Sequence, residues 1–162
     1  MRNSWITKLV ATVFVVSAAM PAMAGPMEDA AAAWERQDYA TAEKLLRPLA
    51  EQGRAAAQHL LARMYENGQG VPRSNVEAAK WYGLAAARGH AGAQLYLANL
   101  YFVGDGVPRD YVQAYVWFSL SEAAGQGEFA SHGRNQVAER MTPAQIAEAE
   151  RRVRAWQPTP GK

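Results

Sequence analysis

Residues 55–90 read AAAQHLLARMYENGQGVPRSNVEAAKWYGLAAARGH, and residues 91–126 read AGAQLYLANLYFVGDGVPRDYVQAYVWFSLSEAAGQ. The second stretch repeats the first at a constant offset of 36 residues, as from Gly68 to Gly104. The other matching pairs are Ala57/Ala93, Gln58/Gln94, Leu61/Leu97, Ala62/Ala98, Tyr65/Tyr101, Gly70/Gly106, Val71/Val107, Pro72/Pro108, Arg73/Arg109, Ala78/Ala114, Trp81/Trp117 and Gly89/Gly125. A repeat of this length indicates an array of helical or similar units, each of which buries its apolar face against its neighbours. The pattern therefore predicts a scaffold that presents a surface, without naming its partner.

The first half of each unit predicts a helix and a sharp stop. Residues 55–67 are rich in alanine, and Leu61 and Tyr65 lie one turn apart on one face. Gly68 is expected to cap this helix in the left-handed conformation. Pro72 then prevents the helix from resuming, because it lacks an amide donor and constrains the residue before it.

The second half of each unit predicts a bulkier helix. Ser74 with Glu77 three residues later has the pattern of a capping box, in which each side chain bonds the other residue's amide. Trp81 and Trp117 follow small alanines and recur at the repeat spacing, so we expect them in the core between units. Gly89 and Gly125 are expected to end these helices.

The repeats are flanked by less regular segments. Residues 27–54 form a degenerate copy without the glycine loop, and Pro48 is expected to kink its second helix. Residues 127–157 predict a capping helix pair, whose last helix begins at Thr142 with a capping box and proline at its first position. Residues 158–162 are expected to form a flexible tail.

The first 24 residues have the pattern of a signal peptide. Arg2 and Lys8 precede an apolar run over residues 9–19, and small residues end the segment at Ala24 before Gly25. We expect cleavage between Ala24 and Gly25 and a periplasmic or secreted mature protein, with one domain over residues 25–157. An uncleaved membrane anchor is the alternative, but the run is shorter than the ~20 residues that a spanning helix needs. Without the leader, 17 basic residues become 15 against 15 acidic ones, so no charge argument favours nucleic acid.

These residues and motifs resemble the Sel-one-like repeat, a branch of the tetratricopeptide superfamily found in exported bacterial proteins. The resemblance implies an all-α, right-handed α-solenoid of about eight helices with a C-terminal capping pair. It further implies a non-catalytic scaffold that binds a protein or peptide of the cell envelope, and we expect a monomer. Related exported proteins that hydrolyse penicillin are rich in cysteine, whereas this chain has none.

Catalytic motifs are absent from the sequence. No Gly-x-Ser-x-Gly or Ser-x-x-Lys occurs, and the glycine loops lack the Lys-Ser/Thr ending of a phosphate loop. The histidines His59, His90 and His132 are isolated from one another by more than a helical turn or two, so no metal or cofactor site is expected. We therefore expect no enzyme, although an envelope enzyme and a simple structural spacer remain alternative interpretations.

The resemblance also places a binding surface. In tetratricopeptide-like arrays the first helix of each unit lines a concave groove. The residues predicted to line it are His59, Arg63, Glu66, Leu95, Asn99 and Phe102. The alternative is that Leu95 and Phe102 pack against the capping helices near Phe129 and Val137.

Overall fold

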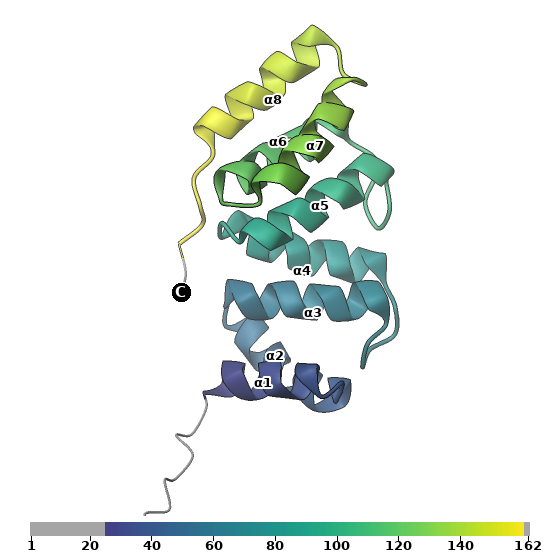
Figure 1. The fold of residues 1–162 in the computed structure, drawn as a ribbon, viewed down its shortest axis with the longest axis vertical. Helices are drawn as coiled ribbons and strands as arrows, with labels where there is room; N and C mark the ends of the chain where they lie inside the picture. The colour runs from purple at the N-terminus through teal and green to yellow at the C-terminus, as the bar shows by residue number, and fades with distance from the viewer. Residues whose placement is uncertain (1–24, 161–162) are drawn as a thin grey trace, which may run out of the picture.

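The computed structural model of the protein describes residues 25–160, and these residues form a stack of eight α-helices without a strand (Figure 1). The helices are α1 (Pro26–Glu35), α2 (Tyr39–Glu51), α3 (Ala55–Asn67), α4 (Asn75–Ala87), α5 (Ala91–Val103), α6 (Tyr111–Ala123), α7 (Gly127–Ala138) and α8 (Pro143–Ala155). From α1 to α7 each helix packs on the next along the chain, whereas α8 packs on α6. The all-α solenoid is thereby confirmed.

The two closely matched units fold alike because their loops carry the same stop signals. Gly68 and Gly104 cap α3 and α5 in the left-handed conformation, with φ of 68° and 81°. Gly106 is also required by close packing, since a Cβ there would lie 2.2 Å from the backbone oxygen of Asn75 at the start of α4. Each glycine loop is therefore pressed against the preceding unit, which fixes the spacing of the stack.

The capping box predicted at Ser74 is only half formed. The Ser74 hydroxyl accepts from the Glu77 amide at 3.3 Å, as expected. The return bond is absent because the Ser74 amide donates to the Tyr65 carbonyl at 2.8 Å. Glu77 turns instead toward Lys80, 3.6 Å away. At the start of α8, both bonds of the box form between Thr142 and Gln145.

The core between units combines small and large residues on each helix, as α4 buries Ala78 together with Trp81 and Tyr82. Tyr82 is fully buried and Trp81 is 8% exposed, which confirms the expected position of that tryptophan. Trp117 differs, because it is only half-buried beside an open notch between α4 and α6. Gln58 and Gln94 add a repeated polar tie, since each buried amide donates to a carbonyl eight residues earlier.

The capping pair closes the C-terminal end of the stack. The inner face of α8 presents Ile146, Ala149, Val153 and Trp156 to the cluster that includes Phe118, as expected. On its outer face Glu148 pairs with Arg152 at 2.8 Å, and Glu150 with Arg154 at 3.8 Å.

The tail is less free than the sequence predicts. After α8 the chain runs back beside the stack (Figure 1), and the Thr159 amide donates to the Ala87 carbonyl at 2.7 Å. Pro158 and the Trp156 ring lie near Gly89. The tail is therefore attached to the C-terminal end of α4 through Thr159.

The predicted signal peptide, residues 1–24, lies outside the described residues. Within residues 25–160, no helix combines the length and the apolar character needed to cross a membrane.

Candidate functional site

A groove of about 390 Å³ lies across the first helices of the two repeats and the first helix of the cap. It is lined by His59, Arg63, Gly92, Leu95, Tyr96, Gln126 and Phe129. These residues come from α3, α5 and the start of α7, with Gln126 directly before α7. His59 and Leu95 occupy the same position of successive units, so the repeat itself brings them side by side.

Three of the six residues predicted from the sequence meet in this groove: His59, Arg63 and Leu95. Glu66 is engaged elsewhere, because its carboxylate accepts a hydrogen bond of 2.7 Å from the Tyr82 hydroxyl. Asn99 is exposed, and its side chain donates to the Leu95 carbonyl one turn earlier, at 3.1 Å.

For Phe102 the structure supports the alternative prediction, packing against the capping helices. Its ring is half-buried against the cluster of the cap, which includes Val137. The Tyr111 ring is 6.0 Å away and the Arg140 guanidinium lies 5.1 Å from its centroid. The structure therefore places Phe102 in the packing of the cap, apart from the groove residues.

Four lining residues were missed from the sequence, and they include the most exposed one. Phe129 is 76% exposed, and the sequence named it only in the alternative in which Leu95 and Phe102 pack against the cap. The cap does not follow the repeat, so spacing gave no rule for the direction of its side chains. Tyr96 could have been found from the sequence, because it occupies the position of Leu60 in the previous unit and differs from it.

The floor of the groove is aromatic. The rings of His59 and His90 stack with centroids 4.4 Å apart, and those of Tyr82 and Tyr96 stack at 5.3 Å. His59 also lies 5.9 Å from both tyrosine rings. His90 is the N-cap of α5, where its Nδ1 accepts from the Ala93 amide at 3.2 Å. The stack therefore joins α3 of one unit to the beginning of the next.

Both stacked histidines are neutral near pH 7. Burial, followed by the charges of His90 and Arg63, lowers the pKa of His59 to about 4. Burial also lowers the pKa of His90. Burial and the hydrogen bond to Glu66 raise the pKa of the Tyr82 hydroxyl, so it remains a donor at that pH.

Arg63 carries the one full positive charge among the lining residues, none of which is acidic. Its guanidinium lies 5.4 Å from the centroid of the Trp34 ring of α1, a cation–π contact. No carboxylate of the described residues lies within ion-pair distance of it.

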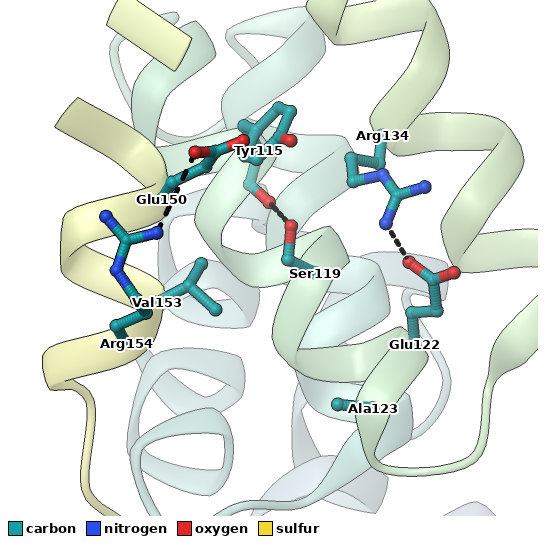
Figure 2. A pocket seen from close by; sticks show the side chains of 8 residues that line it. All are labelled: Tyr115, Ser119, Glu122, Ala123, Arg134, Glu150, Val153 and Arg154. Atoms are coloured by element: carbon teal, nitrogen blue, oxygen red, sulfur yellow. Dashed lines mark hydrogen bonds and ion pairs between the residues drawn. The ribbon is translucent and has the colours of Figure 1, made fainter. Parts of the chain in front are cut away.

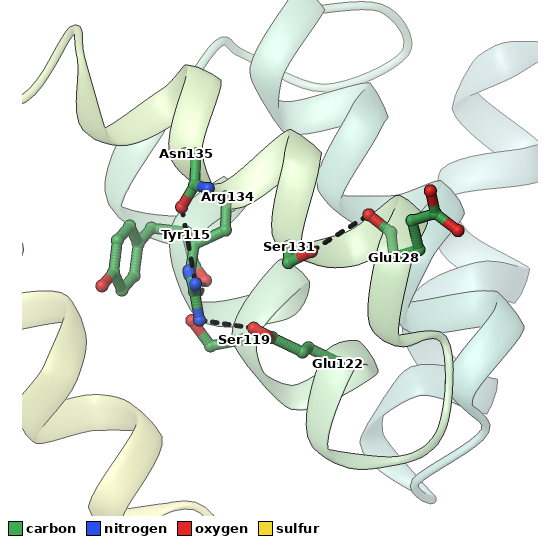
Figure 3. A network of polar contacts seen from close by, with 7 residues as sticks. All are labelled: Tyr115, Ser119, Glu122, Glu128, Ser131, Arg134 and Asn135. Carbon is green, nitrogen blue, oxygen red and sulfur yellow. Dashed lines mark hydrogen bonds and ion pairs between the residues drawn. The ribbon is translucent and has the colours of Figure 1, made fainter.

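A second hollow, of about 470 Å³, lies between α6, α7 and α8 (Figure 2). Its charged groups are already paired, Arg134 with Glu122 and Arg154 with Glu150. The Ser119 hydroxyl donates to the Tyr115 carbonyl at 2.8 Å (Figure 2), and no histidine lines the hollow. Figure 3 shows that the Arg134 guanidinium contacts the Asn135 side chain as well as Glu122. The hollow thus joins the cap to the last repeat and holds no activated nucleophile.

Potential metal ligands are scattered over the described part of the chain. Residues 25–160 contain no group of three or more histidine, cysteine or acidic residues placed to hold an ion.

Comparison with known proteins agrees with this architecture. The Sel1 repeat family model matches residues 55–90 and 91–126. The chain contains two Sel1 repeats. It is a Sel1-like repeat protein, and its matched units coincide with the helix pairs α3–α4 and α5–α6. No curated protein matches the sequence.

Two solved structures share the fold. The first is c5321, a protective antigen of uropathogenic Escherichia coli with an SLR fold, which is 30% identical with a TM-score of 0.75. The match covers 81% of this chain and 29% of that one. The second, a Sel1 repeat protein from Oxalobacter formigenes, is 35% identical with a TM-score of 0.58, covering 60% of this chain and 28% of that one. The chain therefore spans less than a third of the length of either structure.

Proposed function

We propose that this Sel1-like repeat protein is a non-catalytic adaptor of the bacterial cell envelope that holds a segment of a protein partner in the groove of α3, α5 and α7. The family is one of protein–protein interaction scaffolds, which supports the general class. The observation that carries the proposal is the groove itself. It combines an exposed aromatic side chain, Phe129, with a half-buried cation, Arg63, on a rigid stack. Peptide-binding grooves commonly combine an apolar anchor with a charged contact that fixes register.

The envelope location rests on the sequence of the leader. Cleavage after Ala24 would release a mature protein beginning at Gly25 into the periplasm or the medium. Mass spectrometry of the fractionated protein tests this step. A cytoplasmic protein that retains Met1 would contradict it.

Site-specific photocrosslinking in intact cells tests the groove. A benzophenone amino acid at Phe129, which is 76% exposed, is expected to capture a protein partner. The matched controls are Val103 and Val76, which are 66% and 63% exposed and lie outside the groove. Val76 borders the notch between α4 and α6, so it reports on the other candidate surface. Capture from Val76 or Val103 with none from Phe129 would overturn the groove assignment.

A further inference from the structure

The groove is chemically divided along its length. At one end, the exposed ring of Phe129 and the half-buried Leu95 offer apolar surface. At the other end is Arg63 of α3, with neutral His59 beside it. No aspartate or glutamate lines the space between them. A bound segment therefore meets apolar surface and positive charge, and no opposing negative charge.

Arg63 is placed to gain from an acidic ligand. Some arginines of the described chain have carboxylate partners, as Arg134 has Glu122 and Arg152 has Glu148, and others, Arg63 among them, have none. Arg63 is half-buried and rests on Trp34 instead. A partly desolvated guanidinium without a carboxylate makes a strong, often two-pronged, hydrogen-bonded pair when one is supplied.

The nearest acid on the same helix does not fill this role. Glu66 stands three positions after Arg63, a spacing at which side chains can meet. Its carboxylate is held by the Tyr82 hydroxyl at 2.7 Å, and Tyr82 is fully buried. Because that bond fixes Glu66 toward α4, the positive charge of Arg63 is left facing the groove.

We propose that the groove selects protein segments that carry a carboxylate for Arg63 and a large apolar side chain for the surface between Leu95 and Phe129. This inference rests on the proposed function and adds the chemistry of the partner. Packed helices lie about 8–10 Å apart, and an extended segment advances about 3.3 Å per residue. The apolar surface on α5 and α7 lies one to two such spacings from Arg63 on α3, so the two groups are about three to six residues apart in an extended partner.

Selection from a display library of random twelve-residue peptides tests the inference. The full mature protein serves as bait, and bound peptides are sequenced. We expect enrichment of aspartate or glutamate at three to six residues from phenylalanine, tryptophan or leucine. Each enriched peptide is synthesised with a free and an amidated C-terminus, which separates a side-chain carboxylate from a terminal one.

Matched variants locate the carboxylate. Arg63→Met keeps an apolar side chain of similar length and is expected to weaken binding of the enriched peptide about tenfold or more, as loss of a charge-assisted bond does. Lys44→Met removes an exposed positive charge from α2, outside the groove, and should leave affinity unchanged. Arg63→Glu should bind a peptide whose acid is replaced by lysine better than the original peptide. Circular dichroism confirms that each variant folds.

The outcomes separate the inference from the proposed function. If enriched peptides lose binding in Phe129→Ser but show no acidic preference and no response to Arg63→Met, the inference is overturned and the groove stands. If no enriched peptide depends on Phe129, Leu95 or Arg63, both are overturned. Acidic enrichment with the expected response of Arg63→Met supports both.

Discussion

Replacing Gly133 of α7 with alanine tests how the cap is fitted to the last repeat. A Cβ at Gly133 would lie 2.4 Å from the Phe118 ring of α6, and Phe118 is 1% exposed. The ring is enclosed and cannot simply swing aside. Gly133 therefore allows α7 to approach α6 closely, which in turn places Phe129 at the groove.

Gly83 of α4 provides the matched control. It also lies inside a helix, but a Cβ there would meet nothing within 4 Å. Alanine is more favourable than glycine within a helix by about 0.5–1 kcal/mol. Gly83→Ala should therefore raise the free energy of unfolding by that amount.

Gly133→Ala has the same helical gain but adds a clash. Overpacking a buried site costs about 1–3 kcal/mol. Because the helical term is shared, the difference between the two variants isolates this cost, and Gly133→Ala should be the less stable of the two by about 1–3 kcal/mol.

Urea unfolding followed by circular dichroism and by tryptophan fluorescence measures the difference. Agreement of the two probes checks that unfolding is cooperative, which is not assured in a repeat array. A Phe118→Leu change should relieve the clash, so the double variant with Gly133→Ala should be more stable than additivity predicts. Equal stabilisation by Gly83→Ala and Gly133→Ala would refute the close approach of α7 to Phe118.

Three further predictions address the core and the aromatic floor. Trp81→Ala should cost about 3–5 kcal/mol of unfolding free energy in urea titrations, and Trp117→Ala clearly less, because Trp81 is 8% exposed whereas Trp117 is half-buried; equal losses would contradict the burial. Tyr82→Phe should cost about 1–2 kcal/mol by removing the donor to Glu66, whereas Glu66→Gln keeps an acceptor and should cost less. His59 has a pKa near 6.5 in the unfolded chain and of about 4 in the folded protein, so protonation in acid favours the unfolded state. The free energy of unfolding should therefore fall from pH 6.5 toward pH 4, by about 1–2 kcal/mol at pH 5. His59→Gln should flatten that part of the measured pH profile.

The fold was predictable because the ends of its helices are set by residues with distinctive backbone chemistry, such as glycine and proline. The helix predicted over residues 55–67 is observed as Ala55–Asn67, and Gly68 ends it in the left-handed conformation. Such helix ends are determined by local backbone chemistry. Because the same residues recur in the second repeat, each predicted helix end is supported twice by the sequence. The full capping box predicted at Ser74 does not form, because the Ser74 amide donates to the carbonyl of Tyr65, nine residues earlier. A four-residue sequence pattern does not include that contact.

The candidate site was predictable only in part. Spacing identified His59, Arg63 and Leu95 as neighbours on successive first helices, and these three line the groove. The positions of the Phe102 and Phe129 rings depend on how α7 and α8 pack at the end of the stack. The cap does not repeat, so the sequence spacing could not predict this packing. Phe102, which the repeat spacing predicted in the groove, is half-buried against the cap, and Phe129 is exposed at the groove.

The two repeats divide their positions between stacking and recognition. Gln58 and Gln94 are identical, equally buried and tied to the preceding helix in the same way, as the stack requires. Only one residue later, the repeat changes in character from His59 to Leu95. A substitution at the glutamine position would remove this buried bond to the preceding helix, whereas the difference at the next position changes the lining of the groove. The groove therefore changes from a strip that carries the charge of Arg63 to a strip that carries the apolar Leu95, and these lining positions are the ones that can select a partner.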